Sequence, residues 1–243
     1  MPDEAVRNAR TPVPEDARRP RTNAELRDEA IARMLQTAIR LIAERGATRL
    51  SLVDVGREAG YSHSLPNYYF GSKAGLLRQV YAHIIGGARP RIRDWARRHH
   101  PERIRPGLGN IRATVLAYLG LIGDDPTGAR AMHVLWSESI SSMPELVDAV
   151  QPWNRLFVEF FDQQLRVGIA RGEVTPELDV ESVAILLAAV LRGAVAQMLA
   201  DPQQVDIERL ATAAARLIER GVAPTRQQEA TGPADSPDPS PGP

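Results

Sequence analysis

Polar side chains gather in one short stretch of an otherwise aliphatic chain. The segment SHSLPNYYFGSK, residues 62–73, holds serines, a histidine, an asparagine and two adjacent tyrosines, all of which can donate or accept hydrogen bonds. It ends in Lys73, the only lysine of the chain, whose charge favours a nearby anion. A helix that only fills a core needs few such groups. This stretch is therefore expected to touch a polar, anionic partner.

Helical periodicity predicts the elements that lead into this stretch. A first helix is expected to begin near Asn23, a capping residue, and to end at Gly46, where a left-handed conformation can close it. Ser51 followed by Asp54 fits a capping box and predicts a second, short helix over residues 52–59.

Gly60 predicts a tight turn after that helix. Ser62 is placed to cap a third helix, which must end near Phe70 because Ser72 is placed to cap a fourth. Two short helices across a glycine-containing turn describe a helix-turn-helix. In that motif the second helix enters the major groove of DNA. The polar groups available on it are His63, Ser64, Asn67 and Tyr68.

The distribution of charge agrees with a polyanionic partner for the first part of the chain. Residues 1–100 carry 18 Lys and Arg against 11 Asp and Glu, whereas residues 101–243 carry 12 against 19. An ordinary solvated face would give the same composition, so charge alone leaves both interpretations open.

The segment ERGATRLSLVDVGREAGYSHSLPNYYFGSKAGLL, residues 44–77, resembles the DNA-binding end of the tetracycline-repressor (TetR) family of bacterial transcription regulators. The resemblance extends over about residues 25–88 and implies a ligand-responsive repressor that binds a palindromic operator as a homodimer. It departs from the family pattern at Asn67, Gly56 and Pro66. The contacts to double-stranded DNA that it implies come from Ser51, Ser62, His63, Ser64, Asn67, Tyr68 and Lys73.

The rest of the chain predicts an all-α protein, with a DNA-binding domain over residues 23–88 (motif 51–70) and a helical regulatory and dimerisation domain over residues 89–222. Gly86, Gly87 and Pro90 interrupt the fourth helix, either as a hinge or as its end. The basic segment that follows, residues 89–100, is read as a solvated face or a second phosphate contact. Further helices are expected over residues 104–122, 127–139, 145–171, 180–199 and 206–220.

Large side chains concentrate in the middle helices, where they either fill a core or line an apolar cavity with a few polar groups, the usual form of a small-molecule site. The second interpretation predicts a pocket for a hydrophobic or aromatic effector. Arg112 and His133 are its candidate polar groups, and the expected lining residues are Arg112, Tyr118, Met132, His133, Trp136, Trp153 and Phe157.

The last two helices are apolar around much of their circumference. A helix that is covered on one side only needs a narrower apolar face, so a homodimeric four-helix bundle is expected, although these helices could instead close the monomer core. The expected interface consists of Val183, Leu187, Val190, Leu191, Ala194, Leu210, Ala214 and Leu217.

The motifs of the common enzyme classes are missing from the sequence. The chain has no cysteine and none of the nucleophile-elbow, phosphate-loop or zinc-protease motifs, so no catalytic residue, cofactor or metal site is expected. A helical-bundle enzyme and a protein-binding adaptor remain alternatives, and the adaptor leaves residues 62–73 unexplained. No signal peptide or membrane span is expected, which favours the cytoplasm.

Both ends of the chain, residues 1–22 and 223–243, have the composition of disordered segments. Arginines in the first of these could enter a minor groove of DNA. They are Arg10, Arg18, Arg19 and Arg21.

Overall fold

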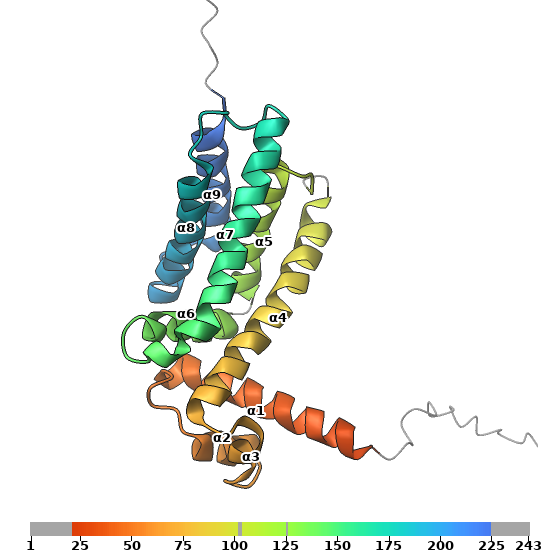
Figure 1. The fold of residues 1–243 in the computed structure, drawn as a ribbon, viewed down its shortest axis with the longest axis vertical. Coiled ribbons are helices and arrows are strands. Elements are labelled where there is room, and N and C mark those ends of the chain that lie inside the picture. The colour runs from red at the N-terminus through yellow and green to blue at the C-terminus, as the bar shows by residue number, and fades with distance from the viewer. Residues whose placement is uncertain (1–20, 102–103, 125, 225–243) are drawn as a thin grey trace, which may run out of the picture.

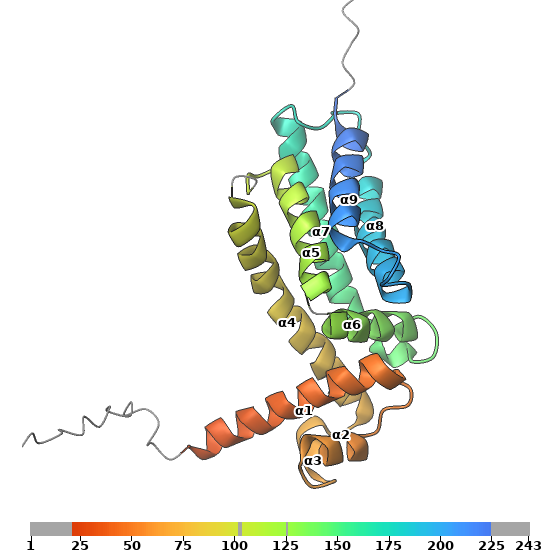
Figure 2. The ribbon, with the colours of Figure 1, turned by 180° about the vertical axis from the view of Figure 1, so that it is seen from behind.

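The computed structural model describes residues 21–101, 104–124 and 126–224, and these residues form α-helices and one 3-10 turn, without strands. Helices α1 to α3 make a head at one end of the molecule, and α5, α7, α8 and α9 run side by side in a body above it (Figure 1). Helix α4 connects the two, and α6 lies across the base of the body next to α1 (Figure 2). The described part therefore has the expected all-α fold.

Helix α1 spans Asn23–Arg45. Its cap is Thr22 rather than Asn23: the Thr22 hydroxyl accepts from the Glu25 amide at 3.2 Å, and the Glu25 carboxylate accepts from the Thr22 amide at 2.7 Å. This reciprocal pair satisfies two backbone donors that a helix start leaves open. Gly46 ends the helix with φ 82°, as expected from its type. Most of the arginines expected to form a minor-groove arm lie outside the described residues.

Helix α2 spans Leu52–Ala59 and α3 spans Leu65–Phe70. The turn between them begins at Gly60, which is left-handed (φ 80°, ψ 28°). The Gly60 amide donates to the Arg57 carbonyl and the Tyr61 amide to the Gly56 carbonyl, the paired pattern that closes many helices. The expected cap of α3 is wrong: α3 starts after Ser64, whose side chain makes no capping bond, because the turn is longer than the sequence suggests.

Helix α4 spans Lys73–His99, is capped by the Ser72 hydroxyl, and runs without a break through Pro90. Gly86 and Gly87, which precede Pro90, therefore do not end the helix. The domain boundary expected at residues 88 and 89 falls inside α4. The head and the body are thus joined by a continuous helix rather than by a linker.

The helices of the body pair along their lengths, α5 with α9 and α7 with α8 (Figures 1 and 2). A short 3-10 turn, η3, leads directly into α7 and contacts α6. The bounds of these elements are α5 Leu108–Asp124, α6 Pro126–Ser139, η3 Pro144–Leu146, α7 Val147–Ala170, α8 Val180–Ala200 and α9 Ile207–Val222. Each lies within a few residues of its predicted range.

The described buried side chains form a large core in the body, a second one centred on the head, and a small cluster of alanines between α4 and α5. The core of the head is not closed by head residues alone. Ala131 and Leu135 of α6, Leu146 of η3 and Val150 of α7 are fully or almost fully buried within it. The head therefore depends for part of its hydrophobic stabilisation on the body.

Among the described helices, α8 alone is long and apolar enough to cross a membrane, judged by length and composition only. In its most apolar stretch of 18 residues, 39% is buried within the chain. Part of the apolar surface of α8 is thus exposed in the single chain.

The close contact between α4 and α5 depends on a glycine. A Cβ atom added at Gly120 would lie 2.3 Å from Cζ2 of Trp95, whose ring also stacks on His99. Real Cβ atoms essentially never approach so closely, so the half-buried Trp95 ring would have to shift away from α5. Gly86, by contrast, is exposed on α4, and a Cβ atom there would meet nothing within 4 Å.

We predict that Gly120→Ala lowers the free energy of unfolding by about 1–3 kcal/mol, the usual cost of overpacking. Gly86→Ala should raise it by about 0.5–1 kcal/mol, because alanine is the better helix former. Urea denaturation followed by circular dichroism measures both. A neutral or stabilising Gly120→Ala would show that Trp95 does not pack tightly on α5.

Candidate DNA-binding surface and ligand pocket

The turn and the first residues of α3 present polar side chains at the tip of the head. Ser62, His63, Ser64, Asn67 and Tyr68 are all exposed, and the Tyr68 side chain is 79% exposed. The opposite side of α3 faces inward, with its proline and its phenylalanine buried against α2 and α4. The structure thus brings these predicted contact residues together on one surface, which we call the α3 surface.

Ser51 and Lys73, the other predicted contacts, are half-buried and bonded within the head. The Ser51 hydroxyl accepts from the Asp54 amide and donates to the Asp54 carboxylate at 2.5 Å. The Lys73 ammonium donates to the carbonyl of Thr48 at 2.6 Å, and the Thr48 hydroxyl donates to Glu138 of α6 at 2.9 Å. Both residues therefore hold the loop between α1 and α2 in place.

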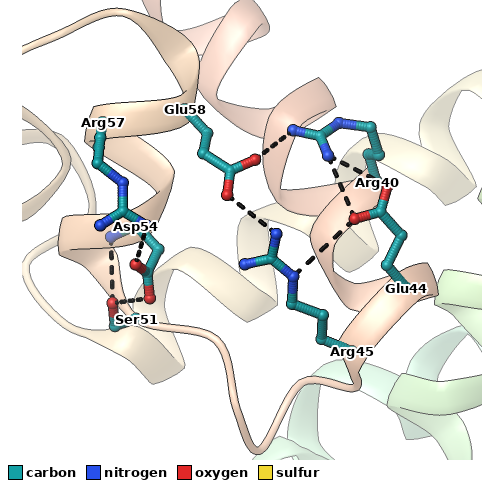
Figure 3. Close-up of polar contacts among 7 residues, drawn as sticks. All are labelled: Arg40, Glu44, Arg45, Ser51, Asp54, Arg57 and Glu58. Atoms are coloured by element: carbon teal, nitrogen blue, oxygen red, sulfur yellow. Dashed lines mark hydrogen bonds and ion pairs between the residues drawn. The ribbon is translucent and has the colours of Figure 1, made fainter.

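Ion pairs fasten α2 to the end of α1 (Figure 3). Glu58 accepts from Arg40 at 2.6 Å and from Arg45 at 3.1 Å. The hydrogen bond from Arg40, followed by the charge of Arg45, lowers the pKa of the Glu58 carboxyl. The bond from Ser51 does the same for the pKa of Asp54. Since both carboxyls are stabilised as anions in the folded state, their contribution to stability is present above their ordinary pKa and is lost on acidification below it.

Two departures from the family pattern, Gly56 and Pro66, lie against each other. A Cβ atom at Gly56 would lie 2.8 Å from the carbonyl oxygen of Ser62 and 3.1 Å from Cγ of Pro66. Glycine at position 56 therefore makes room for the turn and for the proline ring. Pro66 itself is in the first turn of α3, where a missing amide costs no helical hydrogen bond.

The middle helices bring together almost all of the predicted pocket residues around a cavity of about 20 Å³. This volume holds about one water molecule, so the side chains are closely packed in this structure. Tyr81, Arg192 and Val195 complete the lining. The predicted residues that line it are Tyr118, Met132, His133, Trp136, Trp153 and Phe157.

Arg112 is the exception. It lies between α5 and α9, where its guanidinium pairs with Glu219 at 2.5 Å, and it does not line the cavity. The basic group of the pocket is instead Arg192 of α8, which the sequence analysis missed. Its guanidinium lies 5.3 Å from the ring centre of Trp136 and donates to the side-chain oxygen of Asn154. The sequence does not show which of these two arginines faces the cavity, because that depends on how their helices pack.

Burial controls the protonation of the pocket. It raises the pKa of Tyr81 and of Tyr118 to about 12, so both phenols remain neutral donors near neutral pH. Burial and the charge of Arg192 lower the pKa of His133, which favours its neutral form. Arg192 is therefore the one fixed charge among the residues that line this cavity.

Of the residues expected at the dimer interface, the structure leaves Val190 and Leu217 exposed and buries most of the others within the chain. Leu187, Leu191, Ala194 and Ala214 are buried in the chain's own core, because they face α5, α7 and the neighbouring helix rather than solvent. Val183 and Leu210 are half-buried against the same core. The exposed large apolar side chains of α8 and α9 are Ile185, Leu186, Val190 and Leu217, with exposed fractions of 52%, 59%, 38% and 68%.

This fold, with a helix-turn-helix at one end and a helical body around a pocket, defines a class of DNA-binding regulators. Residues 34–80 match the family described as bacterial regulatory proteins, tetR family, and residues 109–223 match the BetI-type transcriptional repressor C-terminal family. The chain belongs to the TetR family and is a DNA-binding, ligand-responsive transcription regulator rather than an enzyme.

Individual proteins are similar to this chain in sequence or in fold. The probable HTH-type transcriptional regulator ArpR of Pseudomonas putida is 24% identical over 189 residues, which cover 77% of this chain and 88% of that protein. A transcriptional regulator from Saccharomonospora viridis, solved with choline, has a TM-score of 0.65 at 23% identity and covers 82% of this chain and 100% of its own. The SmeT–triclosan complex has a TM-score of 0.65 at 19% identity, covering 88% and 100%.

The contact between Gly56 and Pro66 yields a stability prediction. Gly56→Ala should lower the free energy of unfolding by about 1–3 kcal/mol, because the new methyl group overpacks the turn. In a Pro66→Ala background the cost should be smaller, since the ring contact is gone and only the Ser62 carbonyl remains close. A double-mutant cycle in urea measures the coupling. Strictly additive effects would contradict the contact.

Proposed function

We propose that the α3 surface enters the major groove of an operator and reads its bases. The observation that carries this proposal is the grouping of Ser62, His63, Ser64, Asn67 and Tyr68 at the exposed end of the helix-turn-helix. Asparagine can bond both N6 and N7 of adenine, and hydroxyl groups suit either bases or phosphates. A tyrosine exposed to 79% gains little from folding and is explained by a partner.

Ser51 and Lys73 have a different proposed role. Ser51 caps the start of α2 through Asp54, and Lys73 bonds the loop that joins α1 to α2, so the main effect of both on DNA binding is to position the head. The Lys73 ammonium has three donor hydrogens, which leaves it able to contact a phosphate as well.

Regulators of this family dimerise, and we propose that this chain does so through the exposed faces of α8 and α9. Ile185, Leu186 and Val190 lie on one side of α8, and Leu217 lies on α9. Gly193 adds a position on the same face of α8 where nothing lies within 4 Å of an added Cβ, so a second helix can approach closely. A dimer would place two α3 surfaces on a palindromic operator.

We further propose that the cavity lined by Trp136 and Trp153 receives a small-molecule effector, and that the chain is a repressor acting in the cytoplasm. The pocket is apolar with few polar groups, as effector sites usually are. Two structural neighbours were solved with choline and with triclosan, which supports a small-molecule site at the level of the fold. The match to a BetI-type repressor family supports repression.

The base-reading role of Asn67 can be tested on operator DNA selected from random duplexes. Asn67→Ala should weaken operator binding by about 1–3 kcal/mol while leaving nonspecific binding nearly unchanged. Lys73→Met should weaken binding to all sequences, with a salt slope lower by about one unit if it contacts a phosphate. Gln163→Ala, which removes an exposed amide from α7, serves as the control. Equal operator affinity of Asn67→Ala and the wild type would refute base reading.

Dimerisation can be tested by placing charge on the exposed apolar face. Leu186→Glu and Leu217→Glu should each give a monomeric mass in sedimentation at micromolar concentration and lose specific operator binding, because a buried unpaired carboxylate opposes association. Ile140→Glu changes a residue that is 68% exposed and belongs to the turn after α6 rather than to α8 or α9, and it should remain dimeric. A wild-type protein that is itself monomeric would overturn the proposal.

A further inference from the structure

The cavity between α4, α6, α7 and α8 has an unusual electrostatic character. Most of its lining is aromatic or aliphatic, and Arg192 supplies its only fixed charge. No aspartate or glutamate is among the described residues that line it. A half-buried charge is best stabilised by an opposite charge in contact with it, and this apolar site supplies no such counter-charge to Arg192.

The partners of Arg192 are all neutral. One of its nitrogens donates to Asn154 of α7, and its guanidinium lies against the ring of Trp136. No carboxylate lies within ion-pair distance of Arg192 among the residues that the structure describes. Arg112 shows the contrast within the same body, because it is paired directly with Glu219. A guanidinium has five donor hydrogens, so Arg192 keeps donors for a further acceptor.

A second cavity next to this one offers a route to it. A groove of about 510 Å³ between α4, α5 and α7 shares Trp153 and Phe157 with the small cavity. Arg89 and Arg93 of α4 line this groove, and no acidic side chain does so among its described lining residues. Trp153 and Phe157 therefore lie on the boundary between the two spaces. A cleft lined by charges of one sign attracts ligands of the opposite sign.

We propose that the effector is an organic anion: a carboxylate on an aromatic or aliphatic body, with its apolar part between Trp136, Trp153 and Phe157 and its carboxylate on Arg192. The arginine would bind the carboxylate through paired N–H groups, and the Tyr118 phenol is a neutral donor within the same lining. This inference rests on the proposal that this cavity is the regulatory site. It distinguishes the chain from its neighbour solved with choline, because a quaternary ammonium ion would meet the charge of Arg192 without a compensating carboxylate.

The experiment compares matched compounds that differ only in their polar group. Phenylpropanoate, naphthylacetate and decanoate are each tested beside the corresponding primary amide and a trimethylammonium analogue, by calorimetric titration of the full-length protein. For each body that binds, the carboxylate should bind at least about tenfold more tightly than the amide, and the ammonium compound more weakly than either. The same carboxylate should release the protein from its selected DNA.

Variants assign the preference to one side chain. Arg192→Gln should lower carboxylate affinity by about tenfold or more and leave amide affinity within about twofold, whereas Arg192→Lys should keep the preference for the anion. Arg155→Gln removes the same charge from an exposed position on α7 and should behave like the wild type. If Arg192→Gln does not fold, the titrations of the wild type and of Arg192→Lys still decide the outcome.

Three results would overturn the inference: no carboxylate binds, an amide or ammonium compound binds as tightly as its carboxylate, or the preference persists in Arg192→Gln. Each is read from binding in the absence of DNA. Operator binding by the unliganded protein is measured separately. If the wild type binds operator but shows no preference for carboxylates, the proposal of an anionic effector is wrong and the proposed function as a DNA-binding regulator stands. If the wild type does not bind operator, the proposed function is wrong.

Discussion

The packing of α6 against α1 is the contact on which the rest of the structure depends. Ala131 and Leu135 are buried in the core of the head although they belong to a helix of the body. At the end of the same helix, Glu138 accepts from Thr48, whose carbonyl accepts from Lys73. The hydrophobic contact and these hydrogen bonds hold the loop before α2, and through α2 they fix the direction in which the α3 surface faces. Without α6, the core of the head would be open to water on one side.

The same helix also forms a wall of the pocket. Met132, His133 and Trp136 line the cavity, while Ala131 and Leu135, their neighbours in the sequence, face the head. Because a helix moves as a rigid unit, a ligand that displaces Trp136 would also shift the residues that pack on α1. The Arg78 guanidinium of α4 donates to the carbonyl of Glu145 just before α7, which gives the body a second connection to the head. The proposed effector site and the α3 surface are thus linked through side chains of one element and need no long chain of contacts.

The sequence predicted what depends on neighbours along the chain and missed what depends on packing between helices. Ser51, Gly60 and Ser72 act within one or two turns, and their types suffice to place α2, the turn and α4. Most residues that line the cavity were predicted, because large aromatic side chains pack together in the interior wherever they lie in the sequence. Arg112 was predicted and Arg192 was missed, because only the rotation of α5 and α8 decides which guanidinium meets a glutamate. Several residues of the expected dimer interface are buried in the chain for the same reason: α8 is apolar on nearly every side, so its sequence cannot show which side the chain itself covers.

The small volume of the pocket bears on how an effector could act. A ligand shifts an equilibrium only by the difference between its affinities for the two arrangements. A cavity of about 20 Å³ is too small for a drug-sized molecule, so the proposed effector would have almost no affinity for the packed arrangement. Moving from mostly one arrangement to mostly the other requires roughly 5.5 kcal/mol of differential binding. Part of the binding energy is consumed in separating Trp153 from its neighbours, which lowers the observed affinity. A pocket that must open before it binds therefore has a lower observed affinity for the ligand. The difference between the affinities of its open and packed arrangements is larger, and in the proposed mechanism this difference controls DNA binding.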